Sequence, residues 1–122
     1  LQQYNTNSKI CWVAGFSFGS WVAMQLLMRR PEINGFVCIS PPANMRDFSF
    51  LAPCPSPGLI VHGDKDNIAS FDSTKILAEK LQKQKKVEIK FKPIKGADHF
   101  YENYSEDLSN IVDGYIKNSL QI

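Results

Sequence analysis

The sequence predicts an α/β fold in which a parallel sheet of about four strands is flanked by helices. Short apolar segments alternate with longer segments of helical periodicity along the 122 residues. Most of these apolar segments are unbroken, as strands are when helices cover both faces of a parallel sheet. The composition, 43% hydrophobic and 21% charged, is that of a globular protein. We therefore expect one domain, residues 1–122, with right-handed crossovers between its strands.

The first predicted strand, residues 10–14, runs from Ile10 to Ala14 and leads almost directly into a helix over residues 18–30. The strand is continuously apolar. The helix is apolar almost all round and is therefore expected to be deeply buried. Arg29 and Arg30 suit the C-terminal end of this helix, and Pro31 stops it.

A second short strand is predicted over residues 36–40, followed by a loop rich in proline. Residues 41–57 hold five of the seven prolines, so the loop is expected to be stiff, with at most a helical turn around residues 46–51. Its large apolar side chains can cover a substrate pocket or simply anchor the loop, and the sequence leaves both interpretations open: Phe48, Phe50 and Leu51.

The third predicted strand, residues 59–61, precedes a helix over residues 72–85. Asp72 or Ser73 is expected to cap the start of this helix, because both side chains accept hydrogen bonds from free backbone N–H groups. Three apolar side chains at helical spacing are expected to face inward: Ile76, Leu77 and Leu81.

Residues 87–92 alternate apolar with charged side chains, which is typical of an edge strand, and Pro93 is expected to end it. The last helix is predicted to begin near Ser105, with two acidic residues in its first turn. Its apolar side chains at helical spacing form a predicted buried stripe: Leu108, Ile111, Val112, Tyr115, Ile116 and Leu120.

A Gly-x-Ser-x-Gly segment, residues 15–19, joins the first strand to the first helix. A serine at such a sharp turn adopts a strained backbone, and Gly15 and Gly19 remove side chains that would collide with the strand and the helix. The turn then presents the Ser17 hydroxyl above the end of the sheet as a candidate nucleophile. The backbone N–H of Phe18, at the helix N-terminus, can donate to a developing oxyanion. An ordinary turn capped by Ser17 is the alternative, and the flanking apolar strand and helix favour the nucleophile.

A serine hydroxyl is a weak nucleophile until a base takes its proton, and two histidines are present. His99 lies in a loop between the last strand and the last helix, so we expect it to be the base. His62 lies within a strand that should be buried, and we interpret it as a structural residue.

A histidine base needs a carboxylate to orient it, and three aspartates are candidates. Asp66 is favoured, because it lies further out on the loop after the third strand and is better placed to reach His99. Asp64 follows Gly63 directly and can bond its own turn. Asp98 is a lesser candidate, because the immediate neighbour of His99 points elsewhere.

Ser17, Asp66 and His99 each follow a predicted strand, so they are expected on the same rim of the sheet. In these segments the sequence resembles the C-terminal half of an α/β-hydrolase, most of all the small lidless bacterial serine hydrolases related to the dienelactone hydrolases. The resemblance extends from Lys9 onward and rests on four segments: Gly-Phe-Ser-Phe-Gly, Ser40-Pro41-Pro42, His62-Gly63-Asp64-Lys65-Asp66 and Gly96-Ala97-Asp98-His99-Phe100.

The resemblance implies that Ser17 is the nucleophile, His99 the base and Asp66 its partner in the hydrolysis of a small-molecule ester or similar carbonyl. The reaction passes through an acyl-enzyme, and no metal or organic cofactor is implied. Members of this family carry further strands and two helices before the nucleophile, including the loop with the second oxyanion N–H, whereas 16 residues precede Ser17 here. The alternative is therefore a catalytically silent remnant that acts as a binding or assembly module.

The predicted fold is a truncated α/β-hydrolase fold, and without the preceding strands of the family the strand of residues 10–14 becomes an apolar edge. We expect that edge to be covered in one of three ways. The chain is part of a longer protein, a companion chain supplies the missing half, or two copies form a homodimer through the edge.

Charge and composition exclude several other functions. A net charge of +2 does not indicate a nucleic-acid partner, and residues 15–19 have neither the three glycines of a dinucleotide loop nor the Gly-Lys of a P-loop. No apolar run approaches the ~18 residues of a membrane span, and the start lacks a signal-peptide core. We expect a cytoplasmic protein with three reduced thiols: Cys11, Cys38 and Cys54.

Overall fold

The computed structural model describes residues 11–120, and its centre is a parallel sheet of four strands in the order β1-β2-β3-β4. Each strand pairs in parallel with the next one along the chain. The strands are β1 (Trp12–Phe16), β2 (Gly35–Ile39), β3 (Gly58–Gly63) and β4 (Ile89–Ile94). The predicted fold class is confirmed, although β1 lies two residues later than expected, and Ile10 is outside the described residues.

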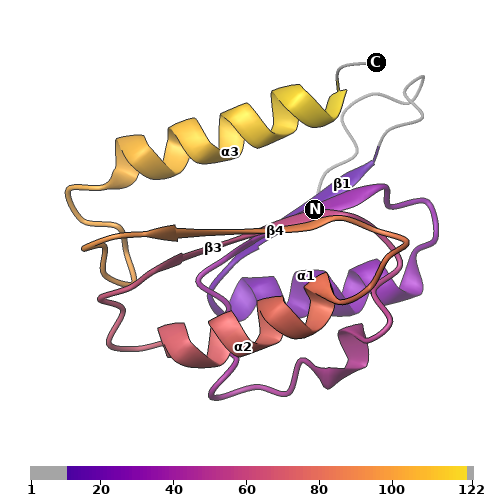
Figure 1. The fold of residues 1–122 in the computed structure, drawn as a ribbon, viewed down its shortest axis with the longest axis horizontal. Helices are drawn as coiled ribbons and strands as arrows, with labels where there is room; N and C mark the ends of the chain where they lie inside the picture. Colours follow the sequence, from indigo (N-terminus) through magenta and orange to yellow (C-terminus); the bar gives the residue numbers. More distant parts are fainter. Residues whose placement is uncertain (1–10, 121–122) are drawn as a thin grey trace.

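Helices cover both faces of the sheet (Figure 1). On one face lie α1 (Phe18–Arg29), α2 (Phe71–Gln82) and the 3₁₀ turn η1 (Ser49–Leu51), and on the other lies α3 (Ser105–Leu120). The core is divided accordingly, because successive side chains of a strand point to opposite faces. On β3, Ile60 joins the core beneath α1 and α2, whereas Leu59 and Val61 join the core beneath α3.

Helix α1 is less buried than its composition suggests. Ala23, Met24 and Leu27 are enclosed against the sheet, whereas Val22 and Met28 are 40% and 39% exposed. Within the described residues α1 contacts β1 and β2, and its buried residues recur at helical spacing along one side. The prediction of a deeply buried helix is therefore wrong for its outer side.

Helix α2 begins one residue earlier than expected, and its cap is Ser70 rather than Asp72 or Ser73. The Ser70 hydroxyl accepts a hydrogen bond of 3.1 Å from the backbone N–H of Ser73. Ile76 is 66% exposed, which contradicts its predicted inward orientation. Leu81 is buried as predicted and Leu77 is partly buried, and Thr74 and Ala78 take the remaining inward positions.

The proline loop, β4 and α3 agree with the sequence predictions in part. Phe48 and Leu51 are buried in the core and Phe50 packs against it, so these side chains anchor the loop. Strand β4 continues through Pro93 to Ile94, because Pro93 pairs only with His62 of β3 and has no further neighbour in the described sheet. Four members of the predicted α3 stripe pack against the core but are only partly buried: Leu108, Ile111, Val112 and Tyr115. Ile116 is half-buried, and the side chain of Leu120 is outside the described residues.

Candidate active site

Ser17 forms the turn between β1 and α1, with φ 56° and ψ −126°. This left-handed conformation is strained for a residue with a side chain. Two backbone hydrogen bonds hold it: the Ser17 N–H donates to the Ile39 carbonyl at 2.8 Å, and the Ser20 N–H donates to the Ser17 carbonyl at 2.9 Å. The turn is thereby fixed to the end of β2 on one side and to the first turn of α1 on the other.

The two glycines that flank this turn have different roles. A Cβ atom at Gly15 would lie 2.4 Å from the Gly19 carbonyl oxygen, so no larger residue fits where β1 and α1 approach each other. A Cβ atom at Gly19 would meet no described atom within 4 Å. The prediction of a collision is correct for Gly15 and wrong for Gly19, because the close approach is made by the backbone of Gly19 itself.

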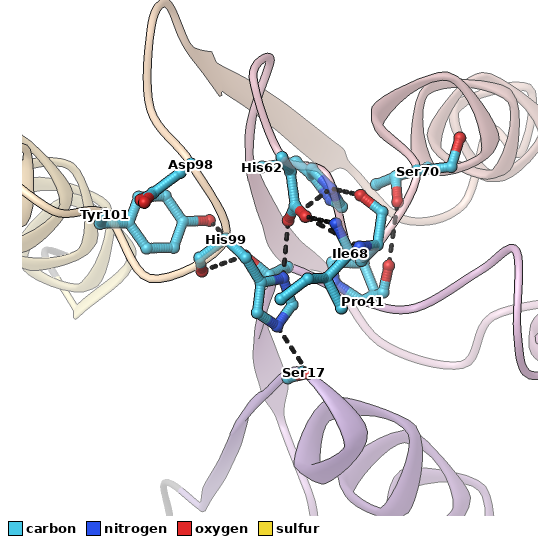
Figure 2. A network of polar contacts seen from close by, with 12 residues as sticks. Ser17, Pro41, His62, Ile68, Ser70, Asp98, His99 and Tyr101 are labelled. Atoms are coloured by element: carbon cyan, nitrogen blue, oxygen red, sulfur yellow. Dashed lines mark hydrogen bonds and ion pairs between the residues drawn. The ribbon is translucent and has the colours of Figure 1, made fainter.

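His99 lies in the loop between β4 and α3 and meets Ser17 with one ring nitrogen. Its Nε2 is 2.9 Å from Ser17 Oγ (Figure 2). Its Nδ1 is 2.7 Å from Asp66 Oδ2. The His99 side chain is 3% exposed, so these contacts lie largely out of water. The structure thus brings together the three side chains that the sequence predicts for one site.

The buried carboxylate of Asp66 is held by both oxygens. Oδ1 accepts hydrogen bonds of 2.8 Å from the backbone N–H groups of Ile68 and Ala69, and Oδ2 accepts one from His99. Because a carboxylate oxygen only accepts, Nδ1 of His99 carries the hydrogen. Nε2 is then free to accept the proton of the Ser17 hydroxyl.

The other two candidate aspartates do not contact His99. Asp64 Oδ1 accepts a hydrogen bond of 2.7 Å from the Gly96 N–H, which ties the loop after β3 to the loop after β4. Asp98 Oδ1 accepts one of 2.9 Å from the Glu102 N–H within its own turn. Their contacts are structural, and of the three only Asp66 faces the imidazole.

Two residues that sequence reasoning did not assign to the site lie behind His99. The hydroxyl groups of Ser40 and Tyr101 are 2.7 Å apart, and the Ser40 hydroxyl also donates to the His99 carbonyl at 3.4 Å. Burial raises the pKa of Tyr101 to about 12, so its hydroxyl keeps its proton and can donate to the Val61 carbonyl at 3.3 Å. In the sequence, only their positions could have indicated this role: Ser40 opens the Ser-Pro-Pro segment, and Tyr101 lies two residues after His99.

His62 is buried on β3, as predicted, and also approaches the site. Its Nε2 is 2.8 Å from the Ala69 carbonyl oxygen and 3.2 Å from Asp66 Oδ2. Its Nδ1 has no hydrogen-bond partner among the described residues. Burial lowers the pKa of His62, which keeps the ring neutral near pH 7.

The mouth of the site is aromatic. The rings of Phe16 and Phe100 have centroids 5.2 and 5.0 Å from that of His99, and their side chains are 40% and 66% exposed. Phe18 is the first residue of α1, so its backbone N–H is among those that an α-helix leaves without an internal partner. An apolar group of a bound molecule can therefore contact the rings of Phe16 and Phe100, while a polar oxygen accepts a hydrogen bond from the Phe18 N–H.

Other reactive groups are less suited to chemistry. All three cysteines are free, and burial raises the pKa of Cys38 to about 12, so that thiol stays protonated. Within residues 11–120, no three histidine, cysteine, aspartate or glutamate side chains are grouped as metal ligands. Over the same residues, no helix has both the length and the apolar character needed to cross a membrane.

The four-stranded sheet, its helices and the serine turn define the α/β-hydrolase class. Residues 1–119 match the model of the dienelactone hydrolase family, and the chain belongs to that family, as the sequence indicated.

Individual relatives agree with this placement. The chain is 51% identical over 120 residues to the uncharacterized protein RP471 of Rickettsia prowazekii (strain Madrid E), covering 95% of this chain and 50% of that protein. Protein ATU1826 of Agrobacterium tumefaciens, of unknown function, is 50% identical with a TM-score of 0.90, over 93% of this chain and 52% of that one. XC6422 of Xanthomonas campestris, an α/β serine hydrolase without a lid, is 27% identical with a TM-score of 0.78, over 91% and 48%. The chain spans about half the length of these relatives.

The contrast between the two glycines gives a first prediction. Gly15→Ala should lower the free energy of unfolding by roughly 1–3 kcal/mol or more, because its methyl group collides with a backbone carbonyl. Gly19→Ala, the matched control, should change it by less than about 1 kcal/mol. Urea denaturation measures both, and equal losses would contradict the close approach at Gly15.

The neutral, buried His62 gives a prediction about pH. Below the ordinary histidine pKa of about 6.5 the unfolded chain binds a proton at His62 that the folded chain does not, because burial lowers the folded pKa. This contribution to stability is present above pH 6.5 and is lost as pH falls toward the lowered value. Between pH 7 and pH 5, urea denaturation should show that the free energy of unfolding falls more steeply for the wild type than for His62→Gln. The same pH dependence of the free energy of unfolding in both proteins would contradict this contribution of His62.

Proposed function

We propose that this chain supplies the catalytic groups of a serine hydrolase that cleaves small-molecule carboxylic esters. The observation that carries the proposal is the contact of His99 with Ser17 Oγ through Nε2 and with Asp66 Oδ2 through Nδ1. Membership of the dienelactone hydrolase family supports the same class of reaction. The exposed rings of Phe16 and Phe100 favour an ester with an apolar part.

The proposed reaction begins when His99 Nε2 takes the proton of the Ser17 hydroxyl as Oγ attacks the ester carbonyl carbon. The carbonyl electron pair moves to its oxygen, and the Phe18 N–H donates to this oxyanion. When the oxyanion collapses, the bond to the alcohol breaks and the His99 imidazolium protonates the departing oxygen. A water molecule, deprotonated by His99, then hydrolyses the acyl-enzyme, releasing the acid and regenerating Ser17.

Asp66 assists each proton transfer through its charge. The carboxylate is excluded from solvent and lies 2.7 Å from Nδ1, where a positive charge on His99 develops. In a poorly hydrated site this attraction is stronger than in water. The ion pair between His99 and Asp66 forms when His99 takes the proton of the Ser17 hydroxyl.

Among its described residues this chain offers one oxyanion donor, the Phe18 N–H, whereas an oxyanion site of this class normally has two. The resemblance places the second donor in a loop ahead of the nucleophile strand, and this chain spans about half the length of its relatives. We propose that the second donor comes from that other half. Losing one donor typically costs on the order of 10²–10³ in rate, so the isolated chain is expected to be a slow hydrolase.

The edge of β1 is the proposed surface for a homodimer or a companion chain. Within the described sheet β1 pairs only with β2, and its Ala14 and Phe16 are exposed. The opposite edge, β4, carries Lys90, Lys92 and Pro93, which discourage pairing. We retain the cytoplasm as the proposed location, because all three thiols are free.

The nucleophile can be tested by covalent labelling. A fluorophosphonate probe should label the chain at Ser17, because His99 activates this hydroxyl, and Ser17→Ala should abolish the signal. Ser109→Ala, at an exposed position on α3, serves as the control and should keep it. In-gel fluorescence and peptide mass spectrometry give the answer, and labelling that persists in Ser17→Ala would contradict the assignment. Ester turnover that is lost in His99→Ala would exclude the silent binding module.

The choice of carboxylate can be tested with two identical chemical changes. Asp66→Asn should lower kcat for a p-nitrophenyl ester about 10⁴-fold, because His99 then adopts the wrong tautomer. Asp64→Asn should lower it less than about 10-fold, since Asp64 contacts the Gly96 N–H and not His99. A larger loss in Asp64→Asn than in Asp66→Asn would reverse the assignment.

The edge of β1 predicts association of the isolated chain. Light scattering should show a dimer, which Ala14→Lys should convert to a monomer by placing a charge on the apolar edge. Ala14→Val keeps the edge apolar and should remain associated. A monomeric wild-type chain would contradict pairing between copies.

A further inference from the structure

His62 is a buried polar side chain that the proposed reaction does not use. It stands on β3 in an otherwise apolar strand and is fully enclosed. Because its Nδ1 has no described partner, an imidazole at this position is less favourable than an aliphatic side chain of similar size. A buried nitrogen left without a partner calls for a compensating contact elsewhere on the ring.

The other ring nitrogen provides that contact. Nε2 lies 2.8 Å from the Ala69 carbonyl oxygen, which can only accept, so Nε2 carries the hydrogen and Nδ1 is bare. The same nitrogen is 3.2 Å from Asp66 Oδ2, while the Ala69 N–H donates to Asp66 Oδ1 at 2.8 Å. His62, Asp66 and Ala69 therefore form a closed ring of polar contacts beside His99.

We propose that His62 is a positioning residue that fixes the carboxylate of Asp66 and, through it, the imidazole of His99. The inference rests on the proposed function above. Oδ2 of Asp66 lies between two imidazoles, 2.7 Å from Nδ1 of His99 and 3.2 Å from Nε2 of His62. With Oδ1 held by two backbone N–H groups, the carboxylate cannot rotate without losing contacts at both oxygens.

A neutral donor suits this role better than a cation. During the reaction His99 becomes an imidazolium that shares Asp66 with His62. A positive charge on His62 would repel that imidazolium and hinder its formation. Because burial lowers the pKa of His62 and keeps the ring neutral, its N–H can hold the Ala69 carbonyl, and with it the Ala69 N–H that donates to Asp66, without this competition.

If His62 only filled space in the core, an apolar side chain of similar size would replace it without loss of activity. The edge of the His62 ring contacts Phe71, with centroids 5.9 Å apart, and an apolar side chain can replace that contact. His62→Leu keeps much of the volume and removes the N–H. His62→Gln places an amide N–H at a similar reach from the backbone and preserves the donor.

The first experiment compares turnover of a p-nitrophenyl ester by the full 122-residue chain and these two variants. His62→Leu should lower kcat about 10–100-fold, because small displacements of a catalytic group have effects of this size. KM should stay within about 3-fold, since His62 does not touch the substrate. His62→Gln should recover kcat to within about 5-fold of the wild type. Equal losses of kcat in both variants, or a loss confined to KM, would overturn the proposal.

The second experiment does not require turnover. A low-field proton NMR signal from Nδ1–H of His99, bonded to Asp66, should persist in His62→Gln and be lost in His62→Leu through exchange with water. Persistence in both variants would overturn the role of His62. In the wild type, ¹⁵N NMR should show His62 with hydrogen on Nε2, and hydrogen on Nδ1 instead would also overturn it. Absence of turnover and of probe labelling alongside the predicted signals would reject the proposed function while supporting the positioning role.

Discussion

The bond between the Asp66 carboxylate and the His99 ring is the interaction on which the arrangement of the site depends. It fixes which nitrogen of His99 carries hydrogen and which faces Ser17. A buried carboxylate needs several hydrogen-bond donors, and Asp66 has two from the loop that follows β3. The three side chains come from the ends of three different strands, so the sheet, rather than any local motif, sets their distances.

The ends of the strands are also where the backbone is strained. Ser17 and Ser40 follow β1 and β2, and each has a positive φ, 56° and 51°. Each donates its N–H to a carbonyl of the neighbouring strand, Ile39 and Val61 respectively, at 2.8 Å. Tyr101, with φ 58°, contacts Ser40 behind His99. Inter-strand hydrogen bonds thus maintain conformations that an isolated loop would leave, and they support the edge of the sheet where the candidate site lies.

Sequence reasoning predicts features that depend on local pattern and on topology. The parallel sheet, the turn at Ser17 and the meeting of Ser17, Asp66 and His99 follow from strands whose ends share one rim. Features that depend on side-chain contacts between elements were missed or wrong. Ile76 points outward because Thr74, Ala78 and Leu81 form the buried side of α2, and the free space at Gly19 depends on the approach of two backbones. The polar contacts of His62 were not visible, because a histidine within a strand indicates only burial.

The most direct test of the central interaction is the protonation state of the His99 ring in solution, measured by ¹⁵N NMR near pH 7. The account predicts a neutral ring with hydrogen on Nδ1 and a bare Nε2, and loss of this state when Asp66 is replaced by asparagine. A His99 ring with hydrogen on Nε2, or one whose state is the same with and without the Asp66 carboxylate, would contradict it.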